Sequence, residues 1–147
     1  KTGFAKSQAG AVAIEFALVF VIFFAVFYAL VSYSLPFVLM QTFNEATSEA
    51  VRRSVGVDPN TPGYASVVVS TANTALTQQL QWVPPALNLV VGVDTSAVYD
   101  ATQGTLTVRV DYPTSKLNQV IPFLVLPGVG AVPSLPATLS AASSLKF

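Results

Sequence analysis

One stretch of this sequence is almost free of charge over the length of a membrane span. Between Ala11 and Asn44 the only charged residue in 34 positions is Glu15, and Phe16–Leu35 supplies 20 consecutive apolar or weakly polar residues. A helix of about 20 residues crosses a hydrocarbon core of about 30 Å. The sequence therefore predicts a transmembrane helix. Its lysine-bearing N-terminal end is expected in the cytoplasm and everything after it outside.

A cleaved secretory signal is the first alternative for this stretch. Such signals have an apolar region of about 7–15 residues, followed by small residues at the cleavage site. Here the apolar run is much longer, and the small residues Ala9 and Gly10 precede it. These two differences disfavour an ordinary signal peptide.

The helical pattern continues beyond the predicted span. Apolar or small residues recur at close to helical spacing after Pro36, at Phe37, Met40, Phe43, Thr47, Ala50, Val51 and Ser54. Gly56, with Pro59 shortly beyond, is expected to stop the helix. We therefore expect one helix from about Val12 to Val55, within a segment 11–56. Its outer half should be amphipathic, and Pro36 should kink it.

Residues 57–147 are predicted to form a small exported domain. Asn60-Thr61-Pro62 is expected to cap a second, amphipathic helix that ends near Trp82. Three strand-like segments follow, at 87–93, 105–112 and 138–147, with turn residues at 94–96 and 102–104. The expected fold class is α+β: a long N-terminal transmembrane helix, an amphipathic helix and a small antiparallel β-sheet.

The segment Val120–Val132 is apolar, uncharged and interrupted by proline. It is too short to span a membrane. We expect it to close over the sheet or the core, and the alternative is a patch for contact with another subunit.

The composition disfavours several kinds of catalytic, metal-binding and nucleic-acid-binding site. The chain has no Cys and no His, which removes the commonest catalytic bases and transition-metal ligands. Seven basic residues balance seven acidic ones, so no basic surface favours a nucleic-acid partner. The aspartates lack calcium-loop spacing, and Arg109 and Asp111 are expected to form a solvated pair. No cofactor, no metal and no enzymatic activity are expected.

Glu15 is the residue that most needs an explanation. An ionised carboxylate inside a membrane costs about 2.5–3.5 kcal/mol even on a permissive scale, so such a group is expected to have a partner. The alternative is that Glu15 lies at headgroup level, where its cost is small.

The residues around Glu15 carry a resemblance. The order is a short lysine-containing leader, Gly10, a small residue, glutamate at the fifth place after the glycine, Phe16 and a long apolar helix. It resembles the processing site of type IV pilin-like precursors. GAVAIEFALVF in particular is similar to proteins of the Tad (tight adherence) pilus. The tail, with TLTVRVDYP and LPATLSAASSLKF, resembles the carboxyl-terminal part of TadE-like minor pilins.

This resemblance implies a function and a set of partners. A prepilin peptidase would cut after Gly10, remove a 1–10 leader and leave Ala11 as the N-terminus. The chain would be a minor pilin, or pseudopilin, that helps to assemble, initiate or cap a pilus for surface adherence. Its partners would be other major and minor pilins, an inner-membrane assembly platform and membrane lipid. Its location would be the bacterial inner membrane, with possible passage into the extracellular pilus.

The resemblance also gives Glu15 a physical role. Cleavage would create an ammonium on Ala11, about one turn from Glu15, and opposite charges attract strongly in apolar surroundings. The ammonium of one subunit could meet Glu15 of its neighbour and set the axial register. Phe16, Phe20, Phe23 and Phe27 lie on one helical stripe, which is expected to pack against other pilin helices or to face lipid.

Two other classes of protein remain open from the sequence. A single-pass membrane protein with an exported scaffold domain would keep residues 1–10 and hold Glu15 at the interface. A membrane-anchored enzyme is poorly supported, because the sequence shows no recognisable pair of a nucleophile and a base.

Overall fold

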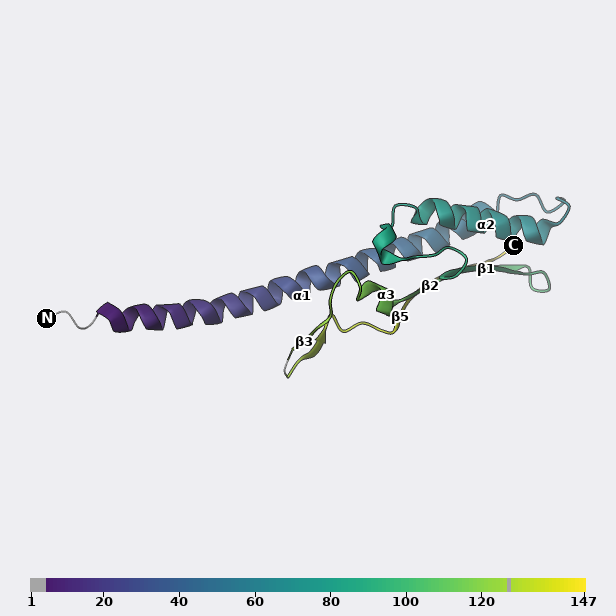
Figure 1. The fold of residues 1–147 in the computed structure, drawn as a ribbon. Helices are drawn as coiled ribbons and strands as arrows, with labels where there is room; N and C mark the ends of the chain where they lie inside the picture. Colours follow the sequence, from purple (N-terminus) through teal and green to yellow (C-terminus); the bar gives the residue numbers. More distant parts are fainter. Residues whose placement is uncertain (1–4, 127) are drawn as a thin grey trace.

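The chain forms a long helix and a small mixed domain. The computed structural model describes residues 5–126 and 128–147, with side chains from residue 10 onward; residues 1–4 of the predicted leader lie outside the described residues. The elements are α1 (Ala5–Ser54), α2 (Tyr64–Leu80), the 3-10 helix η1 (Pro85–Leu87), β1 (Thr95–Asp100), β2 (Thr105–Pro113), α3 (Thr114–Leu117), β3 (Leu124–Leu126), β4 (Gly130–Val132) and β5 (Thr138–Lys146). Figure 1 shows α1 as a rod that projects from the domain. The predicted α+β class is confirmed.

The first helix is longer than expected at its N-terminal end. It begins at Ala5 instead of Val12, and it ends at Ser54, close to the expected Val55. Gly56 lies in the turn that follows and donates its N–H to the Arg53 carbonyl at 3.2 Å. The helix is continuous through Pro36, which is buried against the domain, and Figure 1 shows a gentle curve in place of the expected kink.

Three strands make the main sheet. β2 is central and pairs antiparallel with both β1 and β5, for example Val110 with Thr95 and with Ala141. On β2, alternate residues point to the core, as the sequence predicts; those that are fully buried are Leu106, Val108, Val110 and Tyr112. β5 follows the predicted segment, although only Leu139 and Ala141 are buried along it.

The core lies between this sheet and two helices. The outer half of α1 packs against α2, β2 and β5, and α2 also covers β1. The residues that α1 buries there are Leu39, Phe43, Ala46, Ala50 and Val51. The Phe43 and Tyr112 rings lie 5.9 Å apart, which joins the helix layer to the central strand.

Two local predictions were wrong. α2 begins at Tyr64 after Gly63, whose φ of 72° suits glycine, and no side chain caps it; Asn60 instead donates its N–H to Asp58. Residues 87–93 form no strand. Leu87, Leu89 and Val91 pack into the core from η1 and a loop, whereas Val90 and Val93 are exposed. In this loop Asn88 has a φ of 51° and Gly92 a φ of 91°. These left-handed residues turn the chain too sharply for a strand. The first strand therefore starts at Thr95, where a turn was expected.

The segment Val120–Val132 also differs from the expectation. Phe123 packs against the core and Val132 is buried, but the described residues between them do not close over it. The segment forms the two-stranded hairpin of β3 and β4, whose register pairs Val125 with Ala131. Val125 and Val129 are 78% and 73% exposed. Figure 1 shows this hairpin standing away from the main sheet beside the middle of α1.

Candidate assembly site on the N-terminal helix

The residues of the predicted processing site lie within α1. Gly10 and Ala11 are both helical and exposed, so the bond between them is part of a regular helix. A Cβ atom built at Gly10 meets no atom within 4 Å. The structure therefore gives no packing reason for glycine at this position.

Glu15 is exposed on the same stretch of helix. Among the described side chains, no hydrogen bond or ion pair reaches its carboxylate. The helix surface around it is apolar, because the neighbouring Ile14 and Phe16 side chains are 65% and 70% exposed and cover that surface. A carboxylate in such surroundings needs a partner from outside this part of the chain or contact with water.

The predicted stripe of Phe16, Phe20, Phe23 and Phe27 lies within about 60° of the helix circumference, and its rings belong to two adjacent rows. Phe16, Phe20, Phe24 and Tyr28 follow one another at about one-turn intervals, with ring centroids 6.1 to 6.4 Å apart. Phe23 and Phe27 make a second, parallel row with centroids 6.3 Å apart. The rings in both rows are stacked along the helix surface, as spacing by four residues requires.

Glu15 and the longer aromatic row lie on different sides of the helix. About two and a half helical turns separate Glu15 from Phe24, which puts them on opposite faces. The face of Glu15 carries aliphatic side chains at about one-turn intervals, and all of them are exposed: Val19, Ile22 and Val26. The opposite face is occupied in part by the chain itself. Phe20, Phe24 and Tyr28 line an apolar crevice together with Leu124 and Leu126 of the hairpin.

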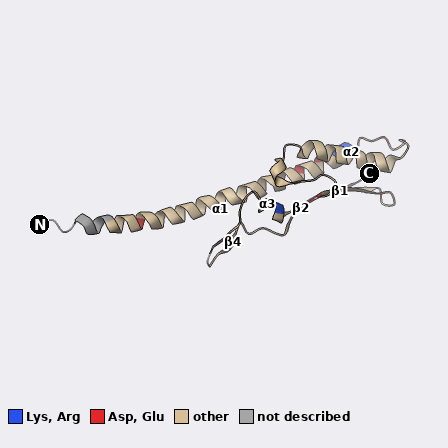
Figure 2. Cartoon of the chain, in the orientation of Figure 1, with Lys and Arg blue, Asp and Glu red and all other residues tan. Residues whose placement is uncertain are grey.

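Charge is distributed unequally along α1. Figure 2 shows the N-terminal half almost wholly uncharged, whereas charged residues gather at its C-terminal end and in the domain. At that end Glu49 accepts hydrogen bonds from Arg52 and Arg53, each at 2.7 Å. These bonds, first that of Arg52 and then that of Arg53, lower the pKa of Glu49 from 4.5 to about 2. The two acidic residues thus have very different surroundings on one helix.

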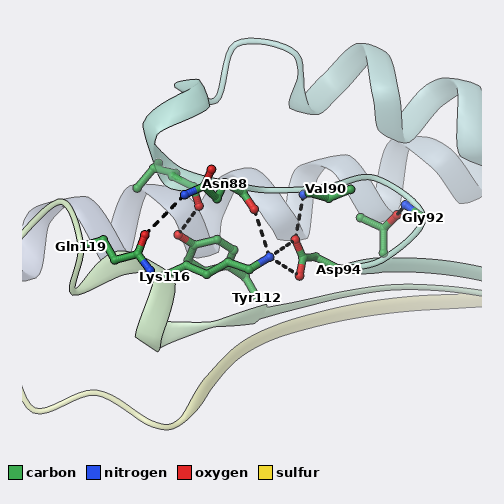
Figure 3. Close-up of polar contacts among 9 residues, drawn as sticks. Asn88, Val90, Gly92, Asp94, Tyr112, Lys116 and Gln119 are labelled. Atoms are coloured by element: carbon green, nitrogen blue, oxygen red, sulfur yellow. Dashed lines mark hydrogen bonds and ion pairs between the residues drawn. The ribbon is translucent and has the colours of Figure 1, made fainter.

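A largely buried ion pair orders the domain that follows α1 (Figure 3). Asp94 is only 4% exposed at its side chain, and the Lys116 ammonium lies 2.7 and 2.6 Å from its two oxygens. The Asp94 carboxylate also accepts the Val90 N–H at 2.8 Å, while Lys116 donates to the Asn88 carbonyl at 3.0 Å. Burial, and then the charge of Asp94, raise the pKa of Tyr112. These bonds tie the loop after η1 to α3.

This pair was not apparent from the sequence. Asp94 was assigned to a turn, and the two residues are distant in the chain, so no spacing motif joins them. The Arg109–Asp111 pair was expected and is confirmed: its atoms are 2.8 Å apart and both side chains are about half exposed. Bonds from Ser140 and Arg109 lower the pKa of Asp111.

Comparison with known proteins identifies the N-terminal helix. A family model described as "TadE-like protein" matches residues 10–52, from Gly10 to the last turn of α1. No curated protein and no solved structure matches the chain. The match includes Glu15 and both aromatic rows, and it confirms the resemblance of this helix to TadE-like proteins; the tail lies outside the matched residues.

Proposed function

We propose that this chain, a TadE-like protein by its matched helix, is a minor pilin (pseudopilin) of the Tad type. The observation that carries the proposal is an exposed glutamate at the fifth place after Gly10, with no partner among the described side chains. It lies on an apolar helix that meets the length of a membrane span. The chain would be anchored in the bacterial inner membrane with its N-terminus in the cytoplasm. Its domain would help to assemble, initiate or cap a pilus for adherence.

Processing would require a local opening of α1. A prepilin peptidase would cleave between Gly10 and Ala11, and a bond inside a helix has to leave the helical conformation to enter an active site. Glycine favours that opening, because it is about 1 kcal/mol worse than alanine in a helix interior. Gly10 is thus explained by cleavage, and packing gives no competing reason for it.

Assembly would use the face of α1 that carries Glu15. The ammonium created on Ala11 of one subunit would pair with Glu15 of the next, and the aliphatic side chains of the same face would pack around the pair. Among these are Val19, Ile22 and Val26, which have no partner in the described part of the chain. Phe23 lies at the edge of this face, about 80° from Glu15, whereas Phe27 lies beside Phe20. Phe20 lines the crevice against the hairpin. Other pilins and an assembly platform are the proposed partners. We propose no catalysis.

The first experiment tests processing. The native N-terminus is determined by mass spectrometry for the wild type, for Gly10→Val and for Ala13→Val as a matched control. We expect a start at Ala11 for the wild type and the control, and an intact leader for Gly10→Val. Because Gly10 has open space around it, this variant keeps the helix. An uncleaved wild type would instead favour a single-pass scaffold protein.

The second experiment tests assembly. Glu15→Gln is compared with Glu45→Gln, which removes an exposed acid from the membrane-distal half of the same helix. We expect Glu15→Gln to insert and to be processed, but to be lost from sheared pili by at least tenfold, with normal incorporation of the control. Normal incorporation of Glu15→Gln would disprove the role of the carboxylate.

A further inference from the structure

The β3–β4 hairpin lies largely outside the core, since Val132 is the one buried residue among those described in its two strands, and it has no assigned role. It belongs to a stretch without charge, since no Asp, Glu, Lys or Arg occurs between Lys116 and Lys146. Its two most exposed side chains are Val125 and Val129, which together give an apolar surface at the end of a projecting element. Exposed apolar patches of this kind on an ordered element mark a contact.

The hairpin is fastened to the apolar half of α1. The Tyr28 hydroxyl donates a hydrogen bond to the Pro122 carbonyl, just before β3. The Tyr33 hydroxyl accepts the Ser134 N–H at 2.8 Å, just after β4. Both ends of the hairpin are thereby held at the level of two tyrosines on the predicted span.

Between these two hydrogen bonds the hairpin lies beside the helix. Leu124 and Leu126 face Phe20, Phe24 and Tyr28 across an apolar crevice of about 160 Å³. The hairpin surface is therefore continuous with the side of α1 that a membrane would surround. Lipid or protein that packs on this side of α1 would therefore also contact the hairpin.

We infer that the β3–β4 hairpin is a lipid-binding element that lies in the outer interface of the membrane, with Val125 and Val129 turned to the acyl chains. Tyrosines gather at headgroup level, and Tyr28 and Tyr33 hold the hairpin at that level. A two-stranded hairpin leaves unpaired backbone groups along its edges, and such groups are costly in hydrocarbon. An interfacial position satisfies both requirements, because water reaches the backbone at the Pro122 and Ser134 ends of the hairpin, while acyl chains cover Val125 and Val129.

This position also moves the expected span. If the outer boundary of the hydrocarbon falls between Tyr28 and Tyr33, a helix segment of about 20 residues begins close to Gly10. The membrane-spanning part of α1 would then start and end several residues earlier than 16–35. Glu15 would lie within the cytoplasmic leaflet, and the domain would rest on the membrane surface.

The test uses single-cysteine variants, since the chain has no cysteine of its own. Val125→Cys and Val129→Cys are labelled with the fluorophore NBD in the full chain and reconstituted into vesicles of phosphatidylcholine and phosphatidylglycerol. Val93→Cys is the matched control, because Val93 is also 78% exposed but lies in a loop of the domain. Quenching by lipids with a nitroxide near the headgroup is compared with quenching by aqueous iodide.

We expect lipid nitroxide to quench the hairpin labels several-fold more than the Val93 label, and iodide to show the reverse order. Equal quenching by iodide at the three positions would overturn the inference. Protection of the hairpin labels from both quenchers, lost when the protein is diluted in lipid, would assign the surface to a second copy and would also overturn it. The result does not depend on cleavage at Gly10 or on Glu15. A failure of this inference can therefore be told apart from a failure of the proposed function.

Discussion

The two halves of α1 belong to one continuous helix but bury their side chains in different ways. Every residue from Gly10 to Phe27 is exposed within this chain. In the outer half, Leu39, Phe43 and Ala46 are at most 1% exposed, because one face is covered by α2 and the sheet. The inner half is apolar all round and the outer half is apolar on one side, which is the difference between a lipid-facing and a core-facing helix.

This difference separates two sources of stability. The outer half is stabilised by contacts inside the chain, so substitutions there change the folding of the domain. Among the described residues, the inner half contacts only the hairpin, at Phe20, Phe24 and Tyr28. Its remaining apolar surface therefore requires lipid or neighbouring subunits. Substitutions there are expected to change insertion and assembly without changing the domain.

A matched pair of phenylalanines tests this separation with the largest expected effect. Phe43→Ala removes a fully buried ring that contacts Tyr112 and should lower the free energy of unfolding of the domain by about 3–5 kcal/mol. Phe23→Ala removes a ring that is 65% exposed and should leave that free energy unchanged. Denaturant unfolding in detergent micelles, followed by near-ultraviolet circular dichroism, measures both. A comparable loss for the two variants would show that the halves are not independent.

The buried ion pair sharpens the comparison on the domain side. Lys116→Met leaves the carboxylate of Asp94 buried without its cation and should destabilise the domain by about 2 kcal/mol. This is less than for a fully buried pair, because the Lys116 side chain is 24% exposed. The same unfolding measurement applies.

Two further variants separate charge from packing. Arg109→Met breaks an ion pair of similar length that is about half exposed, so its effect should stay below about 1 kcal/mol. The double variant Lys116→Met/Asp94→Asn should recover part of the loss, since it leaves no buried charge. Equal effects of the two single variants, or no recovery in the double variant, would contradict the role given to burial.

The elements that could be predicted from the sequence are those with a local signal. The apolar run gave α1, the alternation around Val108 gave β2, and the spacing of Val68, Ala72 and Leu76 gave the buried face of α2. Each of these patterns repeats over several turns or residue pairs. Tertiary contacts therefore had little reason to override it.

The elements that could not be predicted depend on contacts between distant residues. Residues 87–93 are apolar enough for a strand, but the carboxylate of Asp94 binds Val90 and Lys116 and stabilises a loop instead. The hairpin position likewise depends on Tyr28 and Tyr33, which are far from it in sequence. For the candidate site, the glycine and glutamate were readable from their order, whereas the opposite placement of Glu15 and the hairpin required the fold.

Glu15 and Glu49, two of the three glutamates of α1, give the smallest and most specific test. Glu49 is bound by two arginines, so it holds its charge to lower pH in the folded chain than in the unfolded chain, with a pKa near 2 against 4.5. Between these values the unfolded state binds more protons, so the contribution of Glu49 to stability is complete above about pH 4.5 and is lost as the pH falls toward 2. It should be small, because the side chains of Arg52 and Arg53 are 75% and 40% exposed and solvent screens their pairing with Glu49. The denaturation midpoints of wild type and Glu49→Gln should therefore differ slightly at neutral pH and converge below pH 4.5.

Glu15→Gln should follow the wild type throughout, since no contact joins Glu15 to the described domain. If the midpoint of Glu49→Gln differed from that of the wild type by the same amount at every pH, Glu49 would not be the acid-sensitive group. If Glu15→Gln differed from the wild type at neutral pH and converged with it in acid, Glu15 would contribute to the stability of the domain, and the two halves of α1 would not differ as argued.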